Sequence, residues 1–173
     1  MVTSTDCQWF HGPSVASTIL TKGRLEPAEH GRLCADHDGL TSCLHLACAA
    51  LRGGRHAESN AFFTRFRELL EHHMRSEENI LFPRLATMSE PIHRELLDVL
   101  VSEHEALRPW VSAVQASLDD GSASVDEIEE LLHALTAHEA KEEMYLYPIL
   151  SQLADPERLT RLYRQQYSNP ACA

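Results

Sequence analysis

A histidine and a glutamate stand four residues apart at two places in this chain, first as His73 and Glu77 and again as His138 and Glu142. Each pair is followed by a second glutamate and then by leucine, an aromatic residue and proline, and the two phrases lie 65 residues apart. Side chains at positions i and i+4 share one face of a helix, with Cβ atoms about 6 Å apart. The duplicated phrase therefore predicts a metal site built from two similar helical halves.

Apolar residues recur every three or four positions along four long segments, which is typical of amphipathic helices. We expect these helices at about 32–51, 58–85 and 89–120, and from 124 to the end of the second phrase, with a further short helix at 155–167. No segment alternates polar and apolar residues with the period of a strand. The expected fold is all-α, an antiparallel up-down four-helix bundle.

Local signals mark two helix starts and one irregularity. Ser124 and Glu127 form the capping-box pattern at the start of the fourth helix. Ser89 is expected to cap the third helix, with Pro91 in its first turn. Because Pro109 lies inside the third helix, we expect a kink just past the histidine at position 104.

The length of 173 residues favours a single domain with its own core. We divide the chain into an irregular N-terminal arm at 1–30, the bundle at 31–153, and a short C-terminal helix and tail at 154–173. Glycines and prolines punctuate the arm, and no sustained periodicity runs through it. The bundle is therefore the part in which a site is expected.

The formal net charge of −11 disfavours nucleic acid and anionic membranes as partners, because both repel an acidic protein. The longest apolar run, at 44–51, is far shorter than the ~20 residues that span a bilayer. No signal-peptide pattern opens the chain. Five cysteines without a C-x-x-C pair suit a reducing compartment. We expect a cytoplasmic protein that is a monomer or a weak homodimer.

Six polar side chains occupy positions on the apolar stripes of the four helices. They are His37, His73, Glu77, His104, His138 and Glu142. A single histidine on an apolar face is more often a core residue with satisfied hydrogen bonds than a metal ligand. Here, however, no lysine or arginine shares the stripes to neutralise two carboxylates, whose unpaired burial would cost several kcal/mol each. Bound cations would remove that cost, so a metal site is favoured over a buried hydrogen-bond network.

Mixed imidazole and carboxylate ligation suits iron, with manganese and zinc as alternatives. Two glutamates from opposing helices can each bridge two ions, while four histidines supply two nitrogens to each ion. Ions in such pairs lie about 3.5–4 Å apart. This set leaves room for an oxo or hydroxo bridge and for an exogenous molecule. The order His-x-x-x-Glu also differs from the Glu-x-x-His of ferritin-like di-iron bundles.

The chain also repeats internally beyond the duplicated phrase. The segment at 36–40 resembles the segment at 103–107, 67 residues later. The first two helices therefore correspond to the last two, as a two-fold repeat within one core. This register predicts two near-equivalent metal positions.

The six residues, together with Leu81-Phe82-Pro83 and Leu146-Tyr147-Pro148, resemble the hemerythrin-like (HHE cation-binding) family over about residues 32–153. The resemblance implies a hemerythrin-like bundle with a non-haem di-iron centre. It further implies that Glu77 and Glu142 bridge the irons and that the four histidines are terminal ligands.

The chain differs from the oxygen-carrying hemerythrins, which place a fifth histidine in a His-x-x-x-His pair on the third helix. The residues four positions either side of His104 are Leu100 and Arg108. Both irons then lack ligands unless water or another side chain fills in, which disfavours a simple reversible oxygen carrier. Cys7 stands alone, without the N-terminal cysteine motif of iron–sulfur repair proteins, which disfavours that role.

Alternatives stay open for several other residues. Tyr145 and Tyr147 follow Glu142 by about one turn, and they either pack over the site or reach it through a hydroxyl. His45 fits the flank of the bundle better than the place of a fifth ligand, and Cys48 fits a buried structural thiol better than a redox group. The acidic residues that flank two histidines are either solvated or accept hydrogen bonds from imidazole N–H groups. They are Asp36, Asp38, Glu103 and Glu105.

Two functional classes follow from this site. Open coordination positions favour a di-iron oxidoreductase that acts on oxygen, peroxide or nitric oxide in detoxification or stress response. The alternative is a non-enzymatic module that senses iron, oxygen or nitric oxide, or stores metal. It is supported by the lack of an evident second domain or substrate-binding machinery. The expected small-molecule partner is a diatomic molecule or a peroxide.

Overall fold

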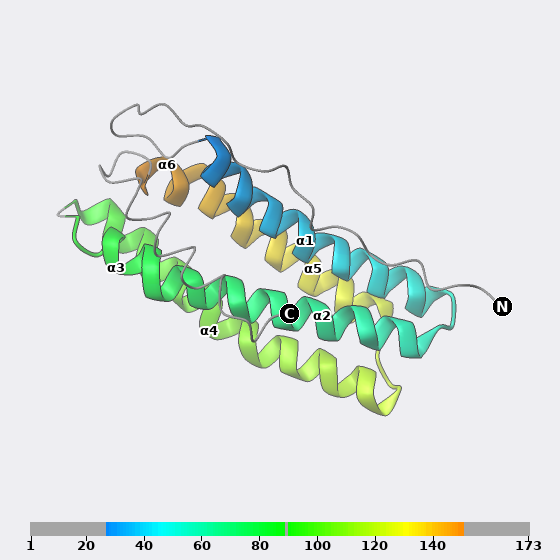
Figure 1. The fold of residues 1–173 in the computed structure, drawn as a ribbon. Coiled ribbons are helices and arrows are strands. Elements are labelled where there is room, and N and C mark those ends of the chain that lie inside the picture. The colour runs from blue at the N-terminus through cyan, green and yellow to red at the C-terminus, as the bar shows by residue number, and fades with distance from the viewer. Residues whose placement is uncertain (1–26, 89, 151–173) are drawn as a thin grey trace.

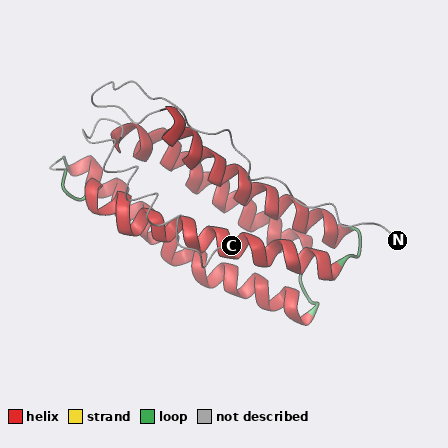
Figure 2. Cartoon of the chain, viewed as in Figure 1, coloured by secondary structure: helices red, strands yellow, loops and turns green. Residues whose placement is uncertain are grey.

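The computed structural model of the chain describes residues 27–88 and 90–150, with side chains described from residue 36 onward. The described residues form four antiparallel helical rods joined by short turns (Figure 1), and no strand occurs among them (Figure 2). The predicted all-α four-helix bundle is confirmed. Most of the predicted arm at 1–30 and the whole predicted helix at 155–167 lie outside the described residues.

Two of the rods are single helices, and the other two each contain a widened, π-helical turn. The single helices are α1 (Pro27–Arg52) and α4 (Pro91–Asp120). The second rod consists of α2 (His56–Ser76), the turn η1 (Glu77–Leu81) and α3 (Phe82–Leu85). The fourth consists of α5 (Val125–Lys141), the turn η2 (Glu142–Leu146) and α6 (Tyr147–Leu150). Contacts of α1 with α2, α2 with α4, α4 with α5 and α5 with α1 close the bundle. None of the described helices is both long and apolar enough to cross a membrane.

Two helix starts follow recognisable end signals. α1 begins at Pro27, earlier than the predicted start near residue 32. Proline fits a first helical position, where its missing N–H would lack a helical partner in any case. Ser124 caps α5 as predicted. Its hydroxyl accepts a hydrogen bond from the Glu127 N–H at 3.2 Å, and the Glu127 carboxylate accepts one from the Ser124 N–H at 2.7 Å.

The start of α4 differs from the prediction. Glu90 holds the N-cap position, and its side chain makes no capping hydrogen bond, while Ser89 lies outside the described residues. The helix continues through Pro109 without interruption to its end at Asp120. The kink expected beside Pro109 stays a prediction.

Each widened turn begins at the glutamate of the duplicated phrase. The Phe82 N–H donates to the Glu77 carbonyl and the Tyr147 N–H to the Glu142 carbonyl, five residues back instead of four. A proline follows each aromatic residue, and in a regular α-helix its ring clashes with the carbonyl four residues before it. The wider turn relieves this clash, and turns of this kind frequently occur at functional sites.

A polar layer separates two apolar clusters in the bundle. The larger cluster includes Met74 and Leu107, and the smaller one includes Leu100. On α4, His104 lies between Leu100 and Leu107, and on the second rod Glu77 follows Met74 by three residues. The predicted ligands therefore lie between two apolar layers, where bulk water is excluded.

Candidate metal centre

All six predicted ligands lie in this buried layer, and none is more than 3% exposed. They are His37 from α1, His73 from α2, Glu77 from η1, His104 from α4, His138 from α5 and Glu142 from η2. The structure thus brings together side chains that are up to 105 positions apart in the sequence.

The donor atoms gather in two groups that share Glu142. In each group, one donor atom per residue lies within 4.8 Å of the others. One group is His37, His73 and Glu142, and the other is Glu77, His104, His138 and Glu142. Each group could hold a metal ion.

The two carboxylate oxygens of Glu142 face different histidine pairs. Oε2 lies 3.1 Å from Nε2 of His37 and 3.5 Å from Nε2 of His73. Oε1 lies 2.7 Å from Nε2 of His138 and 3.9 Å from Nε2 of His104. A single carboxylate therefore spans both groups.

Glu77 lies between the groups in a different way. Its Oε2 atom is 3.5 Å from Nε2 of His73 and 3.4 Å from Nε2 of His104, so one oxygen contacts a histidine of each pair. The other oxygen, Oε1, lies 3.2 Å from the hydroxyl of Tyr147. By donor distance, Glu77 belongs only to the group of His104 and His138. Its contacts with His73 and His104 show that it borders both groups.

Three of the four imidazoles contact an outer carboxylate through the nitrogen that faces away from the layer. Each of these Nδ1 atoms lies 2.9 Å from a carboxylate oxygen. The pairs are His37 with Glu143, His104 with Glu78, and His138 with Glu103. Such a contact fixes the ring orientation and leaves Nε2 able to bind a metal.

Only part of this outer set was predicted from the sequence. Glu103 accepts a hydrogen bond from an imidazole, which was one of the two predicted alternatives. The donor, however, is His138 on the neighbouring helix and not the adjacent His104. Glu78 and Glu143 were missed. The available signal was their position, because each directly follows the glutamate of the duplicated phrase. Glu105, in contrast, is exposed and corresponds to the solvated alternative.

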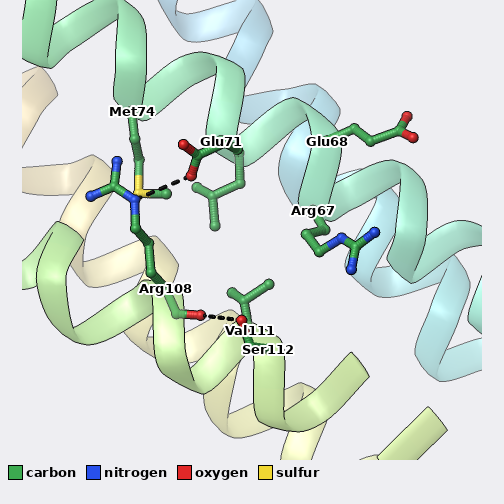
Figure 3. A pocket seen from close by; sticks show the side chains of 8 residues that line it. Arg67, Glu68, Glu71, Met74, Arg108, Val111 and Ser112 are labelled. Carbon is green, nitrogen blue, oxygen red and sulfur yellow. Dashed lines mark hydrogen bonds and ion pairs between the residues drawn. The ribbon is translucent and has the colours of Figure 1, made fainter. Parts of the chain in front are cut away.

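Two cations neutralise two of the three outer carboxylates. Lys141 Nζ lies 2.7 Å from Glu103, and the Arg108 guanidinium lies 2.9 Å from Glu78. Figure 3 shows Arg108 reaching from α4 toward α2, where it also pairs with Glu71 at 3.2 Å. Burial opposes ionisation of Glu78, but hydrogen bonds from its imidazole and guanidinium partners lower its pKa below the ordinary value. Arg108 stands four residues after His104, at a position where a fifth histidine could have stood. It supports the site from outside, because it pairs with Glu78.

His73 departs from the pattern of its three counterparts. Its Nδ1 atom makes no hydrogen bond within the described part of the chain. In the internal repeat, Asp36 stands where the other half has Glu103, and its side chain is one methylene shorter. The two halves thus hold corresponding imidazoles differently.

Tyr147 reaches the site, whereas Tyr145 is 52% exposed. The buried Tyr147 ring stacks on His37 with centroids 5.8 Å apart, and its hydroxyl lies 3.1 Å from His37 Nε2. The corresponding ring of the other half, Phe82, stacks on His104 at 5.2 Å and has no hydroxyl. The surroundings of the two donor groups therefore differ at this aromatic residue, and the prediction of two near-equivalent metal positions stays a prediction.

Burial and the neighbouring charges shift the pKa values of the side chains in this layer. Burial opposes protonation of His73, yet the charges of Glu77 and Glu142 raise its pKa to about 10. Burial likewise opposes protonation of His104, and hydrogen bonds to the same carboxylates raise its pKa to about 9. Burial and the charge of Glu142 raise the pKa of Glu77, whereas four imidazoles outweigh burial and hold the pKa of Glu142 well below its usual range.

Four atoms of the predicted ligands lack a hydrogen bond of good geometry among the described residues. They are both ring nitrogens of His73, Oε2 of Glu77 and Oε1 of Glu142. Leaving a buried polar atom without a partner costs about 1–3 kcal/mol. Imidazole nitrogens and carboxylate oxygens are the donors that iron, manganese and zinc bind. The residues present therefore fit a bound metal.

Comparison with known families agrees with this geometry. The family model described as the hemerythrin HHE cation binding domain matches residues 28–150. The chain belongs to this family. No curated protein and no solved structure matches the chain significantly. Membership confirms the resemblance inferred from the six residues, and together with the buried histidine and glutamate groups it indicates metal binding.

Other side chains of this HHE domain stand apart from the two groups. His45 is exposed on α1, and Cys48 is buried in the larger apolar cluster, as the favoured interpretations of both residues predicted. The burial of Glu139 was not predicted from the sequence. Glu139 is buried next to His138, and burial raises its pKa to about 7.

A cavity of about 360 Å³ lies between α2 and α4 of the domain (Figure 3). Its lining includes Arg67, Met74, Arg108 and Val111, but none of the six predicted ligands. The cavity therefore borders the outer support of the site rather than its donor atoms.

Proposed function

We propose that this protein binds two iron ions in a dinuclear centre formed by four histidines and two glutamates. His37 and His73 bind one ion, His104 and His138 bind the other, and Glu77 and Glu142 bridge them. The observation that carries the proposal is the position of Glu142. Its two oxygens face the two histidine pairs separately, which is the arrangement a bridging carboxylate requires.

Iron is proposed because of the donor set and the family. Four imidazoles with carboxylates are a ligand mixture that suits iron, while a site selective for magnesium or calcium would use oxygen donors alone. Manganese and zinc bind similar donors, so metal analysis of the protein purified from its own host tests this choice directly.

We further propose that the centre reacts with oxygen, peroxide or nitric oxide, in detoxification or a stress response. Iron supplies redox chemistry and open coordination positions when bound at such a site. The chain itself holds the donors, orients three imidazoles through outer carboxylates, and excludes bulk water with two apolar clusters. This enclosure favours reactants of a few atoms.

We also propose that the protein is cytoplasmic and a monomer or weak homodimer. This is supported by the acidic net charge of −11 and by the buried thiol of Cys48, which forms no disulfide within the described residues. Cell fractionation and size-exclusion chromatography test both parts.

Two measurements test the proposed function. First, elemental analysis of iron-loaded protein is expected to give two irons per chain, with His37→Ala losing metal. His45→Ala serves as the matched control, because His45 lies on the same helix and is exposed. Second, protein reduced without oxygen is mixed with oxygen, hydrogen peroxide or nitric oxide and followed by absorption and turnover. Sustained turnover with one of them is expected. A stable, reversible adduct without turnover would replace the enzymatic proposal by a sensing role.

A further inference from the structure

The two halves of the site differ most at one ring. Tyr147 and Phe82 occupy corresponding positions of the repeat, each preceding the proline of its phrase. Each ring stacks on a histidine of the opposite half, Tyr147 on His37 of α1 and Phe82 on His104 of α4, with interplanar angles of 25° and 29°. The internal repeat therefore adds a single phenol oxygen to one side of an otherwise duplicated site.

That oxygen lies among three donor atoms of the proposed centre. Tyr147 Oη is 3.1 Å from His37 Nε2, 3.2 Å from Glu77 Oε1 and 3.4 Å from Glu142 Oε2. Ligand atoms in adjacent positions around one ion, with bonds of about 2.1 Å, lie roughly 3 Å apart. The phenol oxygen has the spacing of a further ligand.

When Glu77 and Glu142 are both ionised and His37 is neutral, as metal ligands are, hydrogen bonding alone does not satisfy these contacts. A neutral phenol has one proton to donate, but two carboxylates lie within 3.4 Å of it. The neutral His37 donates its Nδ1–H to Glu143, so its Nε2 presents a lone pair as well. Three electron-rich atoms thus surround one hydroxyl in a fully buried place. A single cation can bind all of them.

We propose that Tyr147 is a seventh protein ligand, which binds the ion of the His37 and His73 pair as a phenolate. This inference rests on the proposed dinuclear centre. On binding, the O–H bond breaks, an oxygen–metal bond forms, and the proton leaves to solvent. Tyrosine phenolate is an established iron ligand. The ion of His104 and His138, next to the Phe82 ring, then has fewer protein ligands, so a small molecule binds there.

The test compares Tyr147→Phe with Tyr145→Phe. Phenylalanine already occupies the corresponding place in the other half, so the ring itself fits. Each protein is loaded with ferrous iron without oxygen, oxidised with ferricyanide, and examined for iron content, visible absorption and resonance Raman scattering. Wild type and Tyr145→Phe are expected to show a phenolate-to-iron absorption band, whose Raman modes shift when the protein contains ring-deuterated tyrosine. Tyr147→Phe is expected to lose the band and its modes.

Two outcomes would overturn the inference. One is wild-type protein that contains two irons but shows no tyrosine-derived Raman modes, a result that needs no variant to fold. The other is a band that persists in Tyr147→Phe. In both cases the dinuclear centre itself stands, since its own failure would appear as wild-type protein that does not bind iron.

Discussion

Oε1 of Glu142 lies 2.7 Å from Nε2 of His138, four residues earlier on the same rod. The other oxygen of this carboxylate faces His37 on α1 at 3.1 Å. A helix rise of 1.5 Å per residue sets the first contact, whereas only the packing of two rods sets the second. The bridging role proposed for Glu142 depends on both contacts.

Glu142→Ala is expected to lose half or more of the bound iron, because it removes a carboxylate that contacts all four histidines. Glu77→Ala is expected to lose iron as well, since Glu77 contacts one histidine of each pair. Elemental analysis after iron loading measures both, with the exposed Glu130→Ala on α5 as the control. Two irons retained per chain in the Glu142 variant would rule out the bridge.

Metal affinity is expected to fall as pH decreases. In the metal-free chain, the pKa of His73 is about 10 and that of His104 about 9, so both rings are protonated below those values. A metal must displace these protons, and each one displaced lowers the apparent affinity about tenfold per pH unit. Competition with a chelator between pH 6 and 9 measures the slope. Calorimetry in two buffers of different ionisation enthalpy counts the protons, and a count of zero would contradict the prediction.

Glu139→Gln is expected to stabilise the metal-free protein at high pH. The folded-state pKa of Glu139 is about 7, above its ordinary 4.5, because burial disfavours the charged form. The unfolded chain therefore loses this proton first, and stability is lost as pH rises from about 4.5 to about 7. Glutamine avoids this loss, so the variant should be more stable by about 3 kcal/mol at pH 8 and equal to wild type at pH 4.

Thermal or urea unfolding of the metal-free proteins measures this difference. Glu130→Gln, at an exposed position on the same helix, is the matched control and should not change stability at either pH. A Glu139→Gln difference that is the same at pH 4 and pH 8 would mean that charge is not its cause.

Glu78→Ala is expected to weaken iron binding about 10- to 100-fold, as is usual when the outer partner of a ligand histidine is removed. Arg108→Ala should have a smaller effect, because Arg108 contacts Glu78 rather than the imidazole. Chelator competition measures both, with the exposed Glu68→Ala on α2 as control. An unchanged dissociation constant for Glu78→Ala would show that His104 is oriented by packing alone.

Much of the fold follows from local patterns. The apolar stripes mark four helices, and the Ser124 capping box forms as its residues indicate, because both depend on contacts within one helical turn. The start of α4 was less predictable. Serine is a good capping residue, but Glu90 and the proline after it set the helix start there. The π-helical turns were not predicted, since a single sequence reveals the proline but not how the preceding turn adapts to it.

The candidate site divides in the same way. The sequence by itself determined the six polar residues on apolar faces, because the spacing of four places each histidine and glutamate on one face of a rod. Only the tertiary structure decided which donors face each other. It assigned Glu103 to His138 instead of to its neighbour His104, and it brought the hydroxyl of Tyr147 to His37. These contacts join different rods, and their distances depend on how the rods pack and where the π-helical turns rotate the side chains, which no local pattern in the chain specifies.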